Sequence, residues 1–527
     1  MIDRILTVGG YTLVSRITGF LRDVVMAAVL GAGPVADAFF VAFRLPNHFR
    51  AIFAEGAFSA AFVPAYARIR VEGGAEKARA FADRIFTLLL VTQLVLLALA
   101  VGFTPAVIRV LAPGFESDPG RFTLAVALTR VTFPYLLAMT LVSLYGGMLN
   151  ALDRFAAAAA APILLNLSMM ATLALAAFFP SVGYAAAWGV LLAGALEVAL
   201  LAGAIGRLGE LPRLARMTWD ADVKRFFAAL GPAVIGSGGV QLALFADTII
   251  ASFLPTGAIS ALWYADRLNQ LPIGVIGIAV GTVLLPEMSR RIAAGDADGA
   301  RQAQSRAIEF TLLLASPCLV AFVMIPDLIM RALFARGAFT AADAAAAGAT
   351  LAAYAFGLLP FVLIRSMVAM FFARGDTATP VKAALIAVPV NIAFKILLMG
   401  PFAQVGLALS TSIGMWINFL LVLWFGARAG YLRRDPALAR AIAKLVVAAV
   451  ALALVLWLGR GPALDLFAAS GRWRDLFALV LLAAAGGAVY VGVVLALFGR
   501  QWLAQLRRRR AAAGAGGMKP LPELPVE

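Results

Sequence analysis

Residues 85–103 read IFTLLLVTQLVLLALAVGF, without a charged side chain. A helix of this length crosses the hydrocarbon core of a bilayer, which is about 30 Å thick. Similar blocks recur along the chain of 527 residues, which is 63% hydrophobic and only 14% charged. Ordinary soluble domains are about 45–50% apolar and about 25% charged. The sequence therefore predicts an all-α polytopic membrane protein and excludes a soluble globular one.

We predict about 14 transmembrane helices of roughly 20 residues each. Their approximate boundaries are 7–30, 38–66, 85–111, 123–149, 158–179, 184–206, 226–253, 262–288, 307–333, 346–372, 380–399, 404–427, 440–458 and 476–499. With a cytoplasmic N-terminus, most of the 44 Lys and Arg fall in cytoplasmic segments, as the positive-inside rule requires. We therefore expect both termini in the cytoplasm. The net charge of +16 reflects these loops, so no nucleic-acid partner is expected.

The two halves of the chain carry similar motifs at an offset of about 222 residues, as transporter repeats do. AFFVAFRL at 38–45 precedes VPAYAR at 63–68, and ALWYADRL at 261–268 precedes LPEMSR at 285–290. Chance similarity between amphipathic helices is the alternative explanation.

The repeat predicts two pseudo-symmetric lobes of six helices each, residues 1–215 and 216–432. Helices 13 and 14 would occupy residues 433–500. A basic cytoplasmic tail, residues 501–527, contains Arg507–Arg510 and is rich in Ala, Gly and Pro, a composition typical of disorder.

Several basic residues fall inside predicted spans. They are Arg16, Arg22, Arg44, Arg50, Arg130, Arg267, Arg365 and Lys395. Each would cost about 2.5–3.5 kcal/mol at the bilayer centre, so we expect them to face water or one another. Snorkelling to the headgroups is an equal alternative for Arg44, Arg50 and Arg130.

An arginine-lined cavity favours an anion, and guanidinium groups match phosphate oxygens. The sequence therefore indicates a phosphorylated substrate. Acidic residues could pair with the arginines when the cavity is empty; they are Asp23, Asp37, Glu55, Asp247 and Asp266. Helix capping explains Asp37 equally well.

Catalytic and metal-binding patterns are missing from the sequence. Cys318 is the single cysteine and His48 the single histidine, which leaves no His/Cys metal cluster and no Ser/His/Asp set. No Gly-rich phosphate loop with Lys-Ser/Thr occurs. We expect a protein that is not an enzyme and has no cofactor or bound metal.

One long motif resembles the MurJ (MviN) family of lipid II flippases. It runs from Asp37 to Asn47 and continues through Arg50, residues 53–59 and residues 62–64. Shorter matches lie at Ser15-Arg16, Gly19-Phe20, Arg22-Asp23, 112–115 (APGF), 264–268 (YADRL) and 375–380 (GDTATP). The resemblance covers roughly residues 1–430 well and the last two spans by pattern only.

The resemblance implies a 14-helix member of the multidrug/oligosaccharidyl-lipid/polysaccharide exporter superfamily. Two lobes would enclose a central cationic cavity, and helices 13 and 14 would form a groove for an undecaprenyl tail. The matching functional residues are Arg16, Arg22, Asp23, Asp37, Arg50 and Arg267. Of these, Arg22, Asp23 and Arg267 resemble the cluster that meets the diphosphate.

Two positions depart from the family pattern. Gln270 stands where members often carry a Glu. Asp247, Asn391 and Thr411 fall where some relatives bind sodium, but Lys395 occupies the place of a further acidic ligand. Our hypothesis is that Lys395 pairs with Asp247 as the remnant of an ion site and makes the protein sodium-independent.

The predicted function is translocation of lipid II, an undecaprenyl-diphosphate-linked disaccharide-pentapeptide, across the bacterial inner membrane for peptidoglycan synthesis. Partners expected from the resemblance are lipid II, membrane lipids and the cell-wall synthesis machinery, with the protein itself a monomer. The alternatives are export of another polyprenyl-linked glycan and drug or cation antiport by the same superfamily. An antiporter for cations would use acidic and aromatic groups, so the arginines favour the flippase.

Overall fold

The computed structural model describes residues 2–53, 57–432 and 435–499, with the side chains at 2–7, 48–53, 57, 235–243 and 278–283 left undescribed. The side chains of His48 and Arg50, together with Glu55 and the predicted tail at 501–527, lie outside the described residues. Within the described part, regular structure is entirely helical. The predicted all-α class is confirmed.

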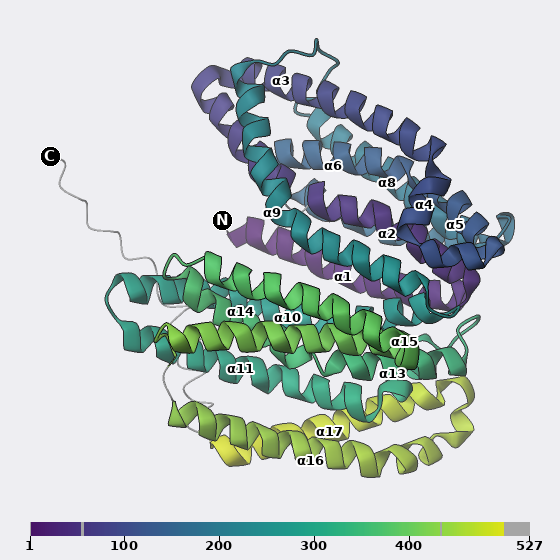
Figure 1. Ribbon diagram of the computed structural model, residues 1–527, viewed down its shortest axis with the longest axis vertical. Coiled ribbons are helices and arrows are strands. Elements are labelled where there is room, and N and C mark those ends of the chain that lie inside the picture. Colours follow the sequence, from purple (N-terminus) through teal and green to yellow (C-terminus); the bar gives the residue numbers. More distant parts are fainter. Residues whose placement is uncertain (1, 54–56, 433–434, 500–527) are drawn as a thin grey trace. The chain divides into compact units, whose positions relative to one another are not determined.

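The first part of the chain forms helices joined by short turns, apart from a longer connector at 207–220 (Figure 1). They are α1 (Ile2–Leu30), α2 (Pro34–Phe53), α3 (Ala57–Gly102), α4 (Thr104–Leu111), η1 (Pro113–Ser117), α5 (Pro119–Thr132), α6 (Pro134–Ala151), α7 (Ala156–Ala174), η2 (Ala176–Phe178), α8 (Val182–Gly206) and α9 (Ala221–Ser252).

The second part continues in the same manner. Its helices are α10 (Ala258–Ala293), α11 (Ala297–Met324), α12 (Pro326–Phe334), α13 (Ala341–Ala355), α14 (Leu358–Phe372), α15 (Ala378–Arg428), α16 (Pro436–Leu466), η3 (Ala468–Trp473) and α17 (Arg474–Phe498).

Breaks inside the apolar blocks come from residues that interrupt helical hydrogen bonding. α5 and α6 are separated at Phe133 because Pro134 has no backbone N–H to donate. The long α3 and α15 each contain one residue with non-helical backbone angles, Gly74 at φ 78° and Ala403 at φ 46°. Several predicted spans are therefore composite. The predicted pair 380–399 and 404–427 corresponds to two helical segments of α15 that meet at Ala403, because Asn391 reaches the Ser410 carbonyl at 2.8 Å, whereas residues this far apart in one continuous helix would be separated by about 28 Å.

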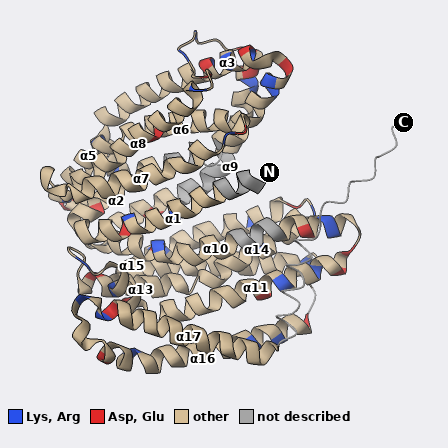
Figure 2. Ribbon diagram, turned by 180° about the vertical axis from the view of Figure 1, so that it is seen from behind, with Lys and Arg blue, Asp and Glu red and all other residues tan. Residues whose placement is uncertain are grey.

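Nine helical stretches in the described part are long and apolar enough to cross a membrane. One of them, Phe58–Gly102, contains all but the last residue of the apolar run at 85–103. Figure 2 shows that charged residues gather at helix ends and at the bend of α3, while most of the ribbon carries other residue types. The chain has the distribution of charge expected of a multi-pass membrane protein.

The chain divides into two compact units. One comprises Met1–Arg267, Leu333–Thr350 and Val388–Thr411; the other comprises Leu268–Ala332, Leu351–Ala387 and Ser412–Glu527. These units do not coincide with the predicted lobes 1–215 and 216–432, because α9 packs against α2 and α3 in the first unit. The lobe assignment, with helices 13 and 14 at 433–500, stays a prediction.

Aromatic side chains hold α3 and α9 together in the first unit. Phe62 stacks on Phe58, Tyr66 and Phe81 at ring separations of 5.2–5.8 Å, and Phe226 of α9 meets Phe62 edge-on at 6.1 Å. All five rings are almost completely buried. Aromatic pairs at these spacings add about 0.5–1.5 kcal/mol each beyond burial.

The two members of the predicted repeat contact each other within the same unit. Phe40 of the motif at 38–45 stacks on Trp263 of the motif at 261–268, with ring centroids 4.6 Å apart. Phe40 also meets Tyr264 edge-on at 5.6 Å. The repeat itself stays a prediction, but its best-matching segments lie against each other.

Candidate functional site

The centre of the candidate site is an ion pair between neighbouring residues of α1. The Arg22 guanidinium donates from Nε and Nη2 to one carboxylate oxygen of Asp23, at 3.1 and 2.7 Å. Its Nη1 donates to the amide oxygen of Asn166 on α7 at 3.1 Å. Arg22 and Asp23 are 7% and 4% exposed. Pairing and hydrogen bonding offset the cost of burying both charges.

Asn166 also fixes the helix that carries this pair. Its amide nitrogen donates to the Ser15 carbonyl and to the Thr18 hydroxyl, both at 3.0 Å. Gly19 lies opposite, where an added Cβ would come 3.5 Å from the Asn166 amide nitrogen. The small residue lets α7 approach α1 closely enough for the amide to reach the backbone.

Arg267 of α10, more than 240 positions later in the sequence, approaches the same carboxylate. Its Nε lies 3.9 Å from the second oxygen of Asp23, and its guanidinium lies over the Trp263 ring at 4.4 Å from the centroid. We call Arg22, Asp23, Asn166 and Arg267 the Asp23 cluster. Two guanidinium groups around one carboxylate form a site that an anion with several oxygens fits.

Arg16 does not join this cluster. It is exposed on α1, whereas Arg22 is buried, as six residues of helix separation, about 240° net, would suggest. Arg44 instead donates to the Thr248 hydroxyl at 2.9 Å. Arg130 and Arg365 are exposed.

Asp37 is completely buried and accepts hydrogen bonds from the beginning of α10. The Gly257 backbone N–H donates at 2.7 Å, and the Ser260 N–H and hydroxyl donate at 2.9 and 2.7 Å. The carboxylate thus caps another helix and not its own. Arg121 of α5 approaches it at 3.5 Å. We call these contacts the Asp37 junction.

Small residues let backbones meet beside the Asp37 junction. Gly114, in the predicted APGF motif, donates its N–H to the Ser252 hydroxyl at 3.0 Å, and a Cβ there would collide with the Ser252 backbone. The Ala338 N–H donates to the Ala28 carbonyl at 2.8 Å. Gly31 and Gly337 have φ values of 69° and 59° at this approach. The junction joins α1, α2, α5 and the start of α10 within one unit.

Arg121 is a site residue that the sequence analysis missed. It is 6% exposed, and besides Asp37 it lies 4.2 Å above the Phe115 ring and 3.4 Å from the Thr256 hydroxyl. In sequence it follows the N-cap Asp118 of α5 and looks like an ordinary loop arginine. No local pattern indicated its distant partners.

The predicted ion-site residues lie on α9 and α15. Lys395, 3% exposed, forms the expected ion pair with Asp247. Asn391 donates its amide to the Ser410 carbonyl at 2.8 Å, and the Thr411 hydroxyl donates to the Leu407 carbonyl at 3.1 Å. Among the described residues, no group of three or more His, Cys, Asp or Glu side chains could hold a metal ion.

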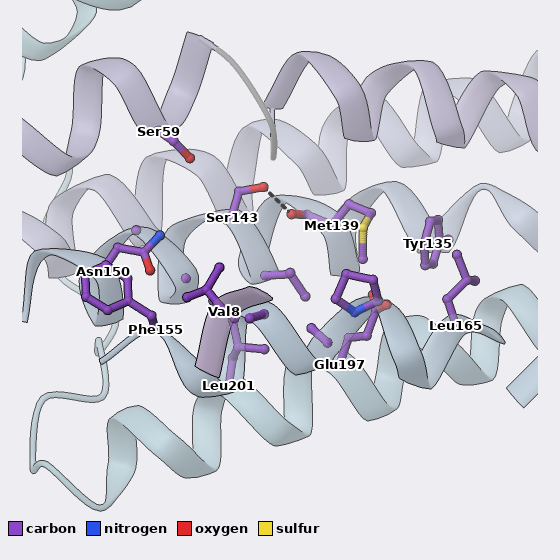
Figure 3. Close-up of a pocket in the computed structure, with 17 residues that line it drawn as sticks. Val8, Ser59, Tyr135, Met139, Ser143, Asn150, Phe155, Leu165, Glu197 and Leu201 are labelled. Atoms are coloured by element: carbon purple, nitrogen blue, oxygen red, sulfur yellow. Dashed lines mark hydrogen bonds between the residues drawn. The ribbon is translucent and has the colours of Figure 1, made fainter. Parts of the chain in front are cut away.

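A cavity of ≈ 350 Å³ lies among α6, α7 and α8 (Figure 3). Tyr135, Met139 and Ser143 line it from one helix, and Glu197 and Leu201 line it from another. Glu197 is 3% exposed and is the one acidic residue of α8. The sequence analysis did not single it out because one carboxylate in an apolar helix makes no motif.

The family described as "Lipid II flippase MurJ" matches residues 26–468.

The chain belongs to the lipid II flippase MurJ family.

A MurJ relative from Rhizobium meliloti (strain 1021), described as a probable lipid II flippase, is 41% identical over 515 residues, 96% of this chain and 96% of that protein. A lipid II flippase MurJ from Burkholderia cenocepacia is 34% identical over 454 residues, covering 85% and 88% of the two chains. The family predicted from the motifs is confirmed, and this chain is a multi-pass transporter of the MurJ family and not an enzyme.

Solved structures give the same fold. A structure titled "Lipid II flippase MurJ, inward closed conformation" has a TM-score of 0.76 at 24% identity and covers 94% of this chain and 99% of that one. An inward-facing multidrug resistance MATE transporter has a TM-score of 0.63 at 14% identity over 80% of this chain and 96% of that one. These similarities show that the chain shares the fold of these two structures.

Proposed function

We propose that this protein is a lipid II flippase that carries the undecaprenyl-diphosphate-linked disaccharide-pentapeptide from the cytoplasmic to the periplasmic leaflet of the bacterial inner membrane. Membership of the MurJ family, with 41% identity over almost the whole length of a relative, carries this proposal. The substrate would be used for peptidoglycan synthesis. Both termini face the cytoplasm in the proposed topology of 14 helices.

The Asp23 cluster binds the diphosphate in this proposal. Asp23 lies 2.7 Å from the Arg22 guanidinium and 3.9 Å from that of Arg267. A diphosphate has more negative charge and more acceptor oxygens than one carboxylate, so it competes for the same donors. Arg16 and Arg50 would attract the headgroup elsewhere along the cavity.

Transport proceeds by alternating access, with the Asp37 junction closing one end. The carboxylate is fully buried among Gly257, Ser260 and Arg121. Opening this end requires those bonds to break together. Because only differential affinity shifts a conformational equilibrium, the substrate must bind less well once Arg267 separates from Arg22.

Lys395 replaces a coupling cation in this protein. Its ammonium pairs with Asp247 between α9 and α15, the position at which a monovalent cation would otherwise balance the carboxylate. Asn391 and Thr411 would be the remaining ligands of that former cation site. The protein would therefore work without sodium. As its partners we propose lipid II, the surrounding lipids and the cell-wall machinery, with the protein itself a monomer.

The first experiment measures exposure of lipid II to a periplasmic probe in cells depleted of this protein. Wild type should restore exposure, whereas Arg22→Ala and Arg267→Ala should restore little, because each removes a donor to the diphosphate. Arg130→Ala, which removes an exposed arginine from another predicted span, is the matched control and should rescue fully. Exposure that never depends on the protein would exclude lipid II as its cargo.

A further inference from the structure

Residues 207–220, between the end of α8 and the start of α9, form an extended connector. Side chains of α3 hold its backbone: Asp83 accepts from the Arg213 N–H at 2.8 Å, and Thr87 accepts from the Ala215 N–H at 2.9 Å. Buried Glu210 bonds Arg70 at 3.0 Å and Arg79 at 3.4 Å. The connector is thus held against α3 by several hydrogen bonds.

The connector exposes large apolar side chains. Leu214 is 72% exposed, Met217 49% and Trp219 57%. Loops of soluble proteins seldom present three such residues within a few positions, because water is a poor solvent for them. They therefore indicate a non-aqueous neighbour.

The apolar surface continues from the membrane-spanning helix before it. Leu192, Leu196 and Leu200 form an exposed row along α8 at a spacing of four residues, which places them on one face. Leu208 and Leu211 of the connector, 39% and 42% exposed, extend the apolar surface. Since α8 is a candidate membrane span, this surface leads from the lipid hydrocarbon to the headgroup region.

The exposed charges of the connector are all positive. The side chains of Arg207, Arg213 and Arg216 are exposed and form no ion pair with the described residues. Its acidic residues are already neutralised, Glu210 by Arg70 and Arg79, and Asp220 by Arg84. The connector therefore presents arginines and apolar groups together.

We propose that the connector binds the headgroups of anionic phospholipids, with Arg213 and Arg216 on the phosphates and Leu214, Met217 and Trp219 at the hydrocarbon boundary. Tryptophan favours this depth because its ring is apolar and its N–H is polar. Arginine binds phosphate by paired hydrogen bonds, and each basic residue at an anionic surface adds attraction. Continuity with the row on α8 favours lipid over a soluble protein.

Fluorescence of Trp219 tests the depth of the connector. The full chain is reconstituted in phosphatidylcholine vesicles that contain brominated chains on either phosphatidylglycerol or phosphatidylcholine, and the signal of Trp219→Phe is subtracted. We expect both brominated lipids to quench the fluorescence of Trp219. Brominated phosphatidylglycerol should reach half-quenching at a lower proportion of the total lipid than brominated phosphatidylcholine. Quenching by aqueous acrylamide but not by lipid would overturn the proposal, and is the result expected of a segment that binds a soluble protein.

Charge variants test the headgroup preference. The double variant Arg213→Ala/Arg216→Ala should raise the proportion of phosphatidylglycerol needed for half-quenching by about 30-fold, equivalent to about 1 kcal/mol per arginine at about 1.4 kcal/mol per tenfold. The control Arg290→Ala/Arg440→Ala removes equal charge elsewhere and should leave the preference intact. If the two double variants raised this proportion equally, the proposal would also be overturned, because net charge alone would then account for the binding of the anionic lipid.

Discussion

Individual polar side chains in this protein bind backbone groups that come from distant parts of the sequence. Asp37 accepts three hydrogen bonds from Gly257 and Ser260, more than 200 positions away. A buried group that loses its partner costs about 1–3 kcal/mol. The burial of the Asp37 carboxylate therefore depends on the packing of α2 against the beginning of α10.

We expect Asp37→Ala to destabilise the protein by about 3 kcal/mol, because it leaves three buried donors and Arg121 without their acceptor. The melting temperature of the protein in detergent measures this loss. Asp118→Ala is the control: it removes the N-cap of α5, which costs about 1 kcal/mol. A melting temperature for Asp37→Ala no lower than that of Asp118→Ala would contradict the expected contribution of the Asp37 junction to stability.

Helices α16 and α17 illustrate how an element is positioned by small and polar residues together. Gly486 faces Leu452 and Leu456 of α16, and an added Cβ would come 2.6 Å from a Leu452 methyl group. The Tyr490 hydroxyl donates to the Leu313 carbonyl at 2.8 Å and lies 2.9 Å from the Ser316 hydroxyl. These contacts fix the helix pair on α11 within the second unit.

Gly486→Leu should lower the melting temperature, since inserting a large side chain into this packing costs about 1–3 kcal/mol. Its neighbour offers a matched control, because a Cβ at Gly487 would meet nothing within 4 Å. Gly487→Leu should be neutral or slightly stabilising, as leucine favours a helix over glycine. Equal effects of the two variants would show that the α16–α17 contact is not the cause.

At the scale of the molecule, segments far apart in sequence build the first unit. Residues 388–411 of α15 pack in it beside α9, and the pair Lys395–Asp247 joins them. If Lys395 replaces a cation, the wild-type melting temperature should be the same in sodium as in potassium or choline at equal ionic strength. A rise specific to sodium would contradict sodium independence.

In every one of these salts, Lys395→Ala should be less stable than the wild type by roughly 2 kcal/mol. This is less than the 3–5 kcal/mol of a fully buried pair, because the Asp247 side chain is 32% exposed. Lys382→Ala, which removes a lysine near the start of α15, should leave the stability unchanged. If Lys395→Ala and Lys382→Ala lost equal stability, the loss of the Lys395–Asp247 ion pair would not be its cause.

Local composition was enough to predict the all-helical membrane class and to single out the arginines at 22 and 267, and the motif that begins at Asp37 was enough to predict the family by resemblance. Charge is costly in hydrocarbon, so a buried arginine is conspicuous in a single sequence. The breaks at Gly74 and Ala403 fall between predicted spans. The break at Phe133, inside the predicted span 123–149, was not predicted, because an apolar block does not reveal backbone angles.

The partners of Asp37 and the burial of Arg121 and Glu197 depended on tertiary structure alone. A carboxylate near a turn has the same local signature whether it caps its own helix or one that begins more than 200 residues later. Periodicity reports which face of a helix is apolar, but it does not identify the helix that packs there. Long-range hydrogen bonds are created only when the chain folds, and so they leave no pattern in neighbouring residues.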